Sequence, residues 1–539
     1  MRSTLPSSGP HCFTNFIHKI TCEQVTEQRK EQTVRKSQVP GDKTVRVPIR
    51  KPGGSSQPTS SYTAVVVWQY RHVLATAAKL PCPPTLPIIG NALLFFGDIV
   101  NVTKNLLKTT TAFKGIFCIW IGPVPLFIAV HPADAQVILN SSSTLERDSV
   151  YSLFKTFLGN SLLPAPVHTW KRYRKLINPV LHPSNVEHFL PVFNDVGWKL
   201  TERFSVSSSP SDRTDDIFDM ALDASIRTVI SRNPISDETK TDIKYILDSI
   251  GRIFILRVFK VWLHVDWLFN LVYWKELKKA RNIIYKCLNA INQGWKEEEA
   301  IRKEIIPDQN LGNARLSGIN LVDVMFDNLP LKVEDHDWRD EVTTMIAGAS
   351  DTVVSCLNLL IFTLGHHREI QDKIFMEIQE VMGDLDRDVT AGDVNSMTYL
   401  GQVILESLRL HGNVVGIMRK ATKDTKLPGC TLPAGSRVVI MLHALGWNEE
   451  QFPKPELFLP ERFSPDKQKE RHNYSFLPFS AGPRNCIGKI YAMMLLKTAL
   501  VHILRRLRVT SHTKLSDIEY ELKVVMYTTT PLLVSFHPR

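Results

Sequence analysis

The most informative stretch of the chain is Phe479-Ser480-Ala481-Gly482-Pro483-Arg484-Asn485-Cys486-Ile487-Gly488, which is rich in turn-forming residues and leads into the apolar segment Lys489 to Arg505. This pattern predicts that Cys486 lies at the N-terminus of a helix. Unpaired backbone N–H groups and the positive end of the helix dipole lower the pKa of a thiol at such a position. Cys486 is therefore a candidate nucleophile or metal ligand. Gly482 and Gly488 are positions where the backbone can approach a flat cofactor closely.

The composition of the chain is that of an ordinary globular protein. Its 539 residues are 43% hydrophobic and 22% charged, which excludes collagen-like, coiled-coil and wholly disordered proteins. The formal net charge is +11, of which residues 1–60 supply +6 through 10 Lys/Arg and 4 Asp/Glu. Because the remaining chain is only mildly basic, we expect no nucleic-acid partner.

The eight cysteines are scattered along the chain, with no C-x-x-C pair and no Cys/His spacing of a zinc site. A disulfide framework is therefore not expected, and the usage suits a reducing compartment. We expect seven of the eight to be inert buried thiols: Cys12, Cys22, Cys82, Cys118, Cys287, Cys356 and Cys430.

The N-terminal part of the chain divides into three segments. Residues 1–60 lack apolar periodicity and are interpreted as a disordered extension, whose acidic residues disfavour a mitochondrial presequence. Residues 61–79 carry a short apolar run, Ala64 to Trp68, that ends before Arg71 and His72. This segment is too short to span a bilayer and is predicted to contact a membrane surface at most. The proline-rich residues 80–91 predict a stiff hinge, and residues 92–539 form the main domain.

The main domain is predicted to be mainly α with a small β-rich portion. Apolar periodicity indicates helices near 190–205, 240–300, 334–366, 367–383, 393–411 and 488–506. Strands are expected at Ile116 to Val130, at Arg437 to Leu442, and between Leu522 and Phe536.

The cysteine segment resembles a known family. Phe479 to Gly488 matches F-x-x-G-x-R-x-C-x-G, the haem-ligand signature of cytochromes P450, at every specified position. The resemblance covers roughly residues 80–539 and implies the cytochrome P450 fold with haem b as cofactor. It implies that Cys486 is the axial thiolate of the haem iron, that Phe479 packs beside the sulfur, and that Arg484 binds a haem propionate.

Two further segments resemble the propionate-binding motifs of this family. Trp170 and Arg174 match its W-x-x-x-R motif, and both are implied to reach haem propionates. Arg419 matches another propionate-binding arginine, although Gly412 to Val415 replaces the prolines expected before it.

Gly348-Ala349-Ser350-Asp351-Thr352 resembles the oxygen-activating helix of the family. The resemblance implies that Thr352 and Asp351 are catalytic, delivering protons to the reacting oxygen where the helix opens locally. Ala349 and Val353 depart from the usual residues, which predicts a narrower groove. Considered without the resemblance, Thr352 is expected to be a helix residue whose hydroxyl donates a hydrogen bond to a backbone carbonyl of the preceding turn.

Glu406 and Arg409 are spaced i and i+3 and can pair on one helix face. They resemble the E-x-x-R motif of the family, completed by Arg462 in Pro460-Glu461-Arg462-Phe463. The resemblance implies a buried structural Glu-Arg-Arg cluster that fixes the loop leading to the cysteine.

Within the family, the cysteine segment and Pro460 to Phe463 look most like the animal family-4 clan, especially its arthropod members. This implies a monooxygenase that inserts one oxygen atom from O₂ into a fatty acid, hydrocarbon, terpenoid hormone or xenobiotic. Many clan members carry a Glu that esterifies the haem where this chain has Gly348, so we expect non-covalent haem. A haem-thiolate isomerase or dehydratase and a catalytically impaired haem- or lipid-binding protein are the alternative functions.

The resemblance also implies partners and a location. The electrons come from NADPH through a separate NADPH-cytochrome P450 reductase, with cytochrome b5 as a second donor. The basic side chains Lys171, Arg172 and Lys175 are either a docking face for such an acidic partner or a merely solvated face. The implied location is the cytosolic face of the endoplasmic reticulum membrane, and mitochondria are the alternative.

Overall fold

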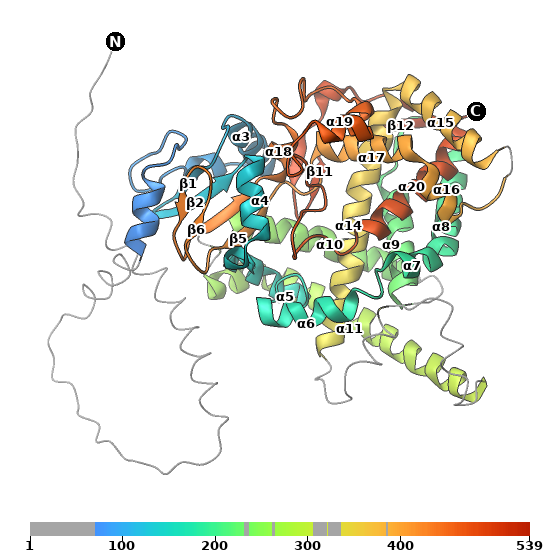
Figure 1. The fold of residues 1–539 in the computed structure, drawn as a ribbon. Coiled ribbons are helices and arrows are strands. Elements are labelled where there is room, and N and C mark those ends of the chain that lie inside the picture. The colour runs from blue at the N-terminus through green and yellow to red at the C-terminus, as the bar shows by residue number, and fades with distance from the viewer. Residues whose placement is uncertain are drawn as a thin grey trace.

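The computed structural model describes residues 70–230, 237–260, 263, 265–305, 321, 336–383 and 386–539. The predicted extension at residues 1–60 and the apolar run from Ala64 to Trp68 lie outside the described residues. The fold is mainly helical with small β sheets, as the sequence predicts. Figure 1 shows the largest sheet at one end of the molecule and a helical body at the other.

Most of the predicted helices are present, some of them divided. The segment predicted at 240–300 forms two helices, and the segment predicted at 393–411 breaks at Met397, where ψ is 80°. The long helices are α8 (Leu190–Ser205), α9 (Thr214–Ile230), α10 (Asp237–Phe259), α11 (Asp266–Ile305), α14 (His336–Gly365), α15 (Arg368–Met382), α17 (Thr398–His411) and α20 (Lys489–Arg506). The shorter ones are α3 (Ile99–Thr111), α4 (Pro132–Asn140), α5 (Lys155–Leu158), α6 (Val167–Ile177), α7 (Pro183–Val186), α16 (Ala391–Ser396), α18 (Leu442–Gly446) and α19 (Pro465–Lys469).

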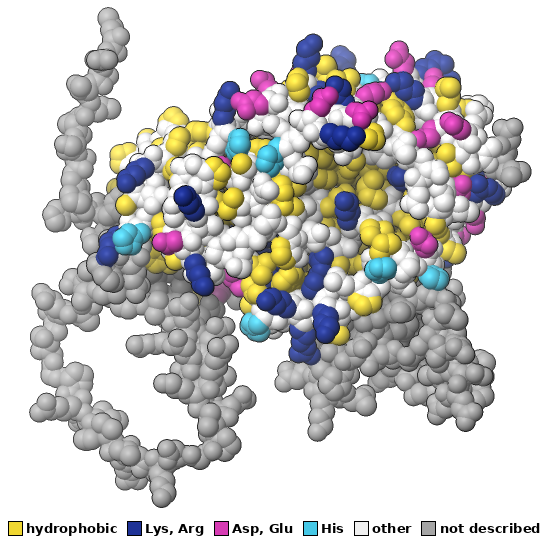
Figure 2. Space-filling model, viewed as in Figure 1, with side chains coloured by type: hydrophobic (Ala, Val, Ile, Leu, Met, Phe, Trp, Pro, Cys, Tyr) yellow, Lys and Arg dark blue, Asp and Glu magenta, His cyan; other side chains and the backbone are white. Residues whose placement is uncertain are grey.

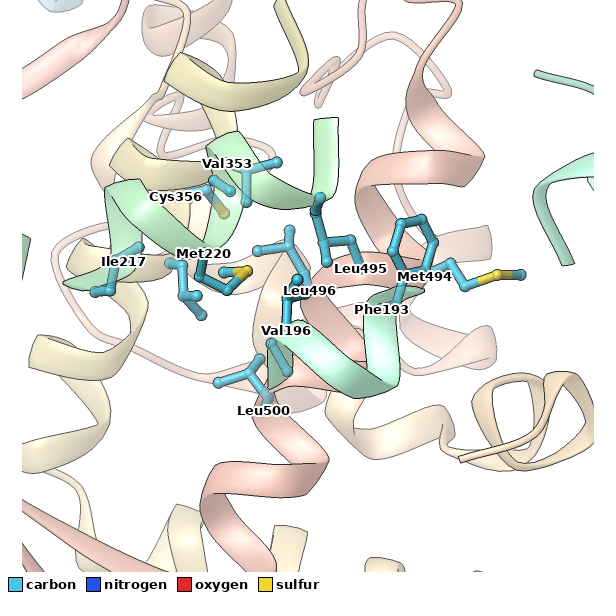
Figure 3. Close-up of a cluster of buried hydrophobic side chains, with 14 of the residues drawn as sticks. Phe193, Val196, Ile217, Met220, Val353, Cys356, Met494, Leu495, Leu496 and Leu500 are labelled. Carbon is cyan, nitrogen blue, oxygen red and sulfur yellow. The ribbon is translucent and has the colours of Figure 1, made fainter. Parts of the chain in front are cut away.

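Helix α14 runs through the middle of the helical body (Figure 1) and packs against α9 and α17. Its segment Trp338–Gly365 is long and apolar enough to cross a membrane, but 61% of its apolar window is buried within the described part of the protein. This burial is that of a core helix. Figure 3 shows Val353 and Cys356 of α14 packed near Met220 of α9 and Leu496 of α20. The predicted inert role of Cys356 agrees with this position.

The largest sheet has the order β1-β2-β8-β5-β3. Its strands are β1 (Phe117–Ile121), β2 (Val124–Ala129), β8 (Arg437–Ile440), β5 (Ile417–Lys420) and β3 (Glu146–Arg147). The strand predicted over Ile116 to Val130 is thus a hairpin. Because β3 pairs with β5, Arg147 lies directly opposite Arg419, which places the two side chains on the same face of the sheet.

The C-terminal region contributes several short strands rather than one long one. The strands β10 (Tyr520–Leu522) and β11 (Met526–Thr528) form a hairpin, and β12 (Leu533–Pro538) pairs with β9 (Leu507–Ser511) and β4 (Ser211–Asp212). A further pair joins β6 (Thr425–Lys426) to β7 (Thr431–Leu432). The β10–β11 hairpin lies against the α14 residues described below.

The proline-rich segment 80–91 is attached to the β1–β2 hairpin. The Asn91 side chain donates to the carbonyls of Pro83 (3.1 Å) and Pro84 (2.9 Å) and accepts from the backbone N–H of Trp120 (2.8 Å). Gly90 has φ of +63°, and a Cβ there would lie 2.4 Å from the Trp120 carbonyl oxygen. Only glycine therefore allows this close approach.

Candidate active site

A cavity of about 1070 Å³ lies where α14, the large sheet, the β10–β11 hairpin and the cysteine segment meet. Its lining is mainly apolar, as is usual for small-molecule sites. Nine of the ten residues predicted to be catalytic or to bind the cofactor line it: Trp170, Arg174, Asp351, Thr352, Arg419, Phe479, Arg484, Cys486 and Gly488. The structure therefore brings together residues that are more than 300 positions apart in the chain.

The loop before α20 presents Cys486 to this cavity. The Cys486 backbone N–H donates to the Phe479 carbonyl at 2.8 Å, and Gly488 is the N-cap of α20. Gly482 adopts φ of +72°, and a Cβ there would lie 2.1 Å from the carbonyl oxygen of Leu139 in α4. Gly482 is not among the residues that line the cavity. Its conformation is explained by the close contact with α4, and not by the approach to a cofactor that we expected.

The Cys486 thiol does not have the lowered pKa expected from its position. Burial raises its pKa, and this effect outweighs the hydrogen bond from the Gly488 backbone N–H and the positive charge of Arg174. The physical reason is that Cys486 lies two residues before the N-cap of α20, so the helix end supplies little beyond that one N–H. A metal ion bound at the sulfur stabilises a thiolate directly.

Three arginines converge on the cavity beside this loop. The Arg484 guanidinium lies 4.7 Å from the centre of the Trp170 ring and donates to the Ala165 carbonyl at 3.0 Å. Its Nε and Nη1 atoms, and Nε of Arg147, are buried and have no hydrogen-bond partner among the residues that the structure describes. Burial and the repulsion between the cations lower the pKa of Arg484 to about 9 and of Arg419 to about 10.

Buried donors without partners cost free energy unless an acceptor is present. This cluster of cations therefore fits an anionic ligand, and the two carboxylates of a haem have the required charge and acceptor atoms. The sequence did not single out Arg147, which contributes one of these donors. Its only signal is the pairing of β3 with β5, which cannot be read from one sequence.

Arg174 makes a different contact from the one implied by the resemblance. It donates through Nη1 to the Asn485 carbonyl (2.8 Å), through Nη2 to Asn485 Oδ1 (2.7 Å) and through Nε to Asn178 Oδ1 (2.9 Å). Arg174 thus joins α6 to the cysteine loop. Its contact with a propionate stays a prediction.

The Glu-Arg-Arg cluster is present and lies outside the cavity lining. Arg409 donates through Nε and Nη2 to the Glu406 carboxylate at 2.8 Å each, and both side chains are fully buried. Arg462 Nε lies 3.3 Å from Glu406 Oε1. Further bonds run from Arg409 to the carbonyls of Gly446 and Leu457, so the cluster ties α17 to the segment that precedes the cysteine loop.

On α14, Thr352 Oγ1 donates to the Gly348 carbonyl at 2.8 Å. This is the bond back to the preceding turn that the residue pattern alone suggests. The structure has α14 as one helix from His336 to Gly365, so the local opening implied by the resemblance is not seen. Val353, one of the departures from the family pattern, is 2% exposed and belongs to the hydrophobic core.

Asp351 accepts a hydrogen bond from the Tyr527 hydroxyl of the β10–β11 hairpin. Burial raises the pKa of Asp351 to about 6, although the Tyr527 hydrogen bond and the positive charge of Lys523 act in the opposite direction. The sequence did not indicate Tyr527, because it lies 176 residues from its partner. A carboxyl group with a pKa near neutrality is suited to proton transfer.

An apolar cavity lined by Cys486 on its loop and by Arg147, Arg419 and Arg484 fits a haem-thiolate protein. The Cytochrome P450 family profile matches residues 80–536. The chain belongs to the cytochrome P450 family, as the cysteine segment indicates, and it is a P450 monooxygenase with haem as its cofactor.

Family-4 cytochromes P450 from insects and mammals are similar to this chain. It is 30% identical to Cytochrome P450 4c21 of Blattella germanica, over 86% of this chain and 93% of that protein. It is 28% identical to Cytochrome P450 4V2 of Homo sapiens, over 85% and 88%, and 26% identical to Cytochrome P450 4g15 of Drosophila melanogaster, over 87% and 93%. The predicted likeness to the family-4 clan is confirmed.

Proposed function

We propose that this monooxygenase inserts one atom of O₂ into a lipophilic substrate held in the apolar cavity, using electrons from NADPH delivered by NADPH-cytochrome P450 reductase. The observation that carries the proposal is that Cys486, the arginine cluster and the Asp351–Thr352 pair line one cavity. Fatty acids, hydrocarbons, terpenoid hormones and lipophilic xenobiotics match its mainly apolar lining.

The side of the cavity that carries Cys486 and the arginine cluster, here called the cysteine side, would hold the cofactor. Cys486 would bind the iron through its sulfur. Arg147 and Arg484 would bind the propionates with the donors that have no partner among the described residues, and Arg419 lines the cavity beside them. Gly348 lines the same cavity, and a Cβ there would meet no atom of the described residues within 4 Å. With no carboxylate at this position, haem is bound non-covalently. Haem found attached to the denatured protein by mass spectrometry would contradict this assignment.

On the side of the cavity formed by α14, here called the α14 side, Asp351 and Thr352 take part in proton transfer. Haem supplies the activation of O₂ and the oxidising power for the reaction. Asp351 can bind and release a proton because its pKa is raised to about 6. The Thr352 hydroxyl donates its one proton to Gly348, so its oxygen can accept from a group in the cavity. The apolar lining excludes water around both residues and so strengthens their hydrogen bonds.

The electron donor docks on the face that carries α6. Lys171, Arg172 and Lys175 are exposed there, and Figure 2 shows Lys and Arg side chains gathered over the α5–α6 part of this face. Arg174 of the same helix contacts the cysteine loop, so a partner bound at α6 is close to the cofactor site. Complementary charge favours an acidic reductase or cytochrome b5 at this surface.

The protein works at the cytosolic face of the endoplasmic reticulum membrane. Several large apolar side chains near the N-terminal end of the described chain are exposed, including Leu93 (56%) and Phe96 (73%), and suit contact with lipid. Cell fractionation that finds the protein in the mitochondrial matrix, reduced by a ferredoxin, would support the alternative location.

The proposed function is tested by the visible spectrum of the dithionite-reduced protein with CO. We expect a strongly red-shifted Soret band that is lost in Cys486→Ser. Cys356→Ser is the matched control, because Cys356 also lines the cavity but belongs to the hydrophobic core, and it should keep the band. A haem protein without this band favours the catalytically impaired alternative. A normal band with peroxide rearrangement but no reductase-dependent turnover favours the isomerase.

A further inference from the structure

The β10–β11 hairpin surrounds Asp351 with groups that no part of the mechanism above uses. The Tyr527 hydroxyl donates to Asp351 Oδ1. The Lys523 ammonium lies 4.8 Å from the centre of the Tyr527 ring and forms an ion pair with Asp248 Oδ1 of α10 at 2.7 Å. The side chain of Asp248 is 42% exposed, whereas that of Lys523 is 16% exposed. A connected set of polar side chains therefore extends from the cavity wall to the surface.

Asn413 fastens this hairpin to α14. Its side-chain amide donates to the Thr352 carbonyl at 2.8 Å, and its own carbonyl accepts from the Met526 backbone N–H at 2.8 Å. The Ser355 hydroxyl contacts both Asn413 Oδ1 and the Met526 carbonyl oxygen. Asn413 lies in the segment where the resemblance led us to expect prolines, which have no side-chain amide. The departure from the family pattern thus has a structural use in this chain.

We propose that Tyr527 is a positioning residue for Asp351, and that the Lys523–Asp248 pair sets the charge of this carboxyl group from the surface. The inference rests on the proposed function and deepens it, because it names the groups that position Asp351 and influence its charge. Tyr527 lies next to Met526, whose backbone is bonded to Asn413, so its hydroxyl is held in place against α14.

The groups around Asp351 act on its protonation in opposite directions. Burial is the largest effect and favours the protonated carboxyl, whereas the hydrogen bond from Tyr527 and the charge of Lys523 lower the pKa, and the charge of Asp248 raises it. Glu521 lies 3.9 Å from Lys523, and Arg252 pairs with Asp248 at 2.6 Å. Asn413 and Thr352 are neutral. Each charged neighbour is therefore expected to shift the pKa of Asp351 in the direction that its charge dictates.

The test is a pH titration of the Asp351 carboxyl band by infrared spectroscopy of the ferric holoenzyme, with the band identified by its loss in Asp351→Asn. Tyr527→Phe removes the hydroxyl and keeps the ring, so we expect the titration midpoint to move to higher pH. Tyr520→Phe is the matched control on the same hairpin, because its hydroxyl contacts His411 Nδ1 at 2.8 Å instead. It should leave the midpoint unchanged.

Two further variants separate this role from a general loss of structure. Lys523→Met should move the midpoint to higher pH, and Asp248→Asn should move it to lower pH, because these charges act on Asp351 with opposite signs. A structural disturbance of the hairpin has no reason to give opposite shifts. An unchanged midpoint in Tyr527→Phe, or shifts of the same sign in the two surface variants, would overturn the inference.

The outcome can be separated from that of the proposed function. The infrared titration needs no substrate and no electron donor, whereas the proposed function is judged by the CO spectrum and by turnover. A normal CO band with an unchanged midpoint refutes only the role of Tyr527. A missing CO band in the wild-type protein refutes the proposed function while the carboxyl titration still reports on the hairpin.

Discussion

The cysteine side and the α14 side of the cavity are built on different principles. On the cysteine side, buried donors of Arg147 and Arg484 have no partner within the described part of the chain, and the cations around Arg484 lower its pKa. On the α14 side, Asp351 and Thr352 have hydrogen-bond partners within the protein. The first arrangement is complete only with an anionic ligand, whereas the second is prepared by the protein alone. Substitutions on the two sides should therefore have different consequences for stability and for cofactor binding.

The largest loss of stability is expected from Glu406→Ala, because Glu406 is the carboxylate of the Glu-Arg-Arg cluster that ties α17 to the segment before the cysteine loop. It leaves two guanidinium groups, Arg409 and Arg462, without their buried carboxylate partner, which costs about 3–5 kcal/mol. Urea unfolding should show this loss, together with a smaller fraction of protein that gives the thiolate CO band. The control is Glu461→Gln, whose ion pair with Lys373 is 53% exposed at the carboxylate. It should cost less than about 1 kcal/mol, and equal losses in the two variants would contradict the structural role of the cluster.

The second prediction concerns the α14 side, where Asp351 should make the free energy of unfolding depend on pH. The Asp351 carboxyl has an ordinary pKa of 3.8 but a folded-state pKa of about 6. Between these values the folded protein binds a proton that the unfolded chain does not, so the free energy of unfolding falls as pH rises from 4 to 6. The loss is on the order of 2 kcal/mol. It should be absent in Asp351→Asn, measured by urea unfolding at several pH values.

A matched acidic residue provides the control for this pH dependence. The side-chain hydrogen bond from Arg387 holds the pKa of Asp393 at about 2, so Asp393 is ionised above about pH 5 in both the folded and the unfolded chain. Asp393→Asn should therefore follow the wild-type curve between about pH 5 and 7, displaced by a constant amount. If Asp351→Asn also follows the wild-type curve at a constant displacement, the pKa of Asp351 is not raised in the folded protein.

On the cysteine side, Arg484→Met is expected to cost less stability than Glu406→Ala and to weaken haem binding. The substitution removes a buried cation with two unpaired donors, so the haem-free protein should lose no more than about 1 kcal/mol of stability. Haem affinity should fall at least about tenfold, because a propionate partner is lost. Haem titration and unfolding of the haem-free protein measure the two quantities. Arg172→Met, on the exposed face of α6, should change neither, and a large loss of haem-free stability in Arg484→Met would refute the difference between the two sides.

How far the sequence predicts this molecule depends on the distance over which each signal acts. The ten residues around Cys486 predict the ligand and its loop because the motif is local, and the Glu406–Arg409 pair is readable from helix spacing. The raised pKa of Cys486 is not readable from the sequence, because the position of the N-cap and the packing around the loop depend on tertiary structure. Arg147 and Tyr527 could not be found, because each acts through a strand pairing or a hydrogen bond that joins distant segments.

The last prediction concerns Thr352→Ala, which tests the chemistry of the α14 side and is expected to change stability only slightly. The hydroxyl makes one hydrogen bond within its own helix, to Gly348, so its removal should cost only about 0.5–1.5 kcal/mol and leave the CO band intact. If Thr352 takes part in proton delivery as proposed, a larger share of the electrons from NADPH should be lost as peroxide in this variant. The ratio of product to NADPH consumed measures this loss. Thr343→Ala is the matched control on the same helix, because its hydroxyl makes the equivalent bond to the Arg339 carbonyl at 2.8 Å but does not line the cavity. Equal coupling in the two variants would show that the Thr352 hydroxyl serves the helix and not the reaction.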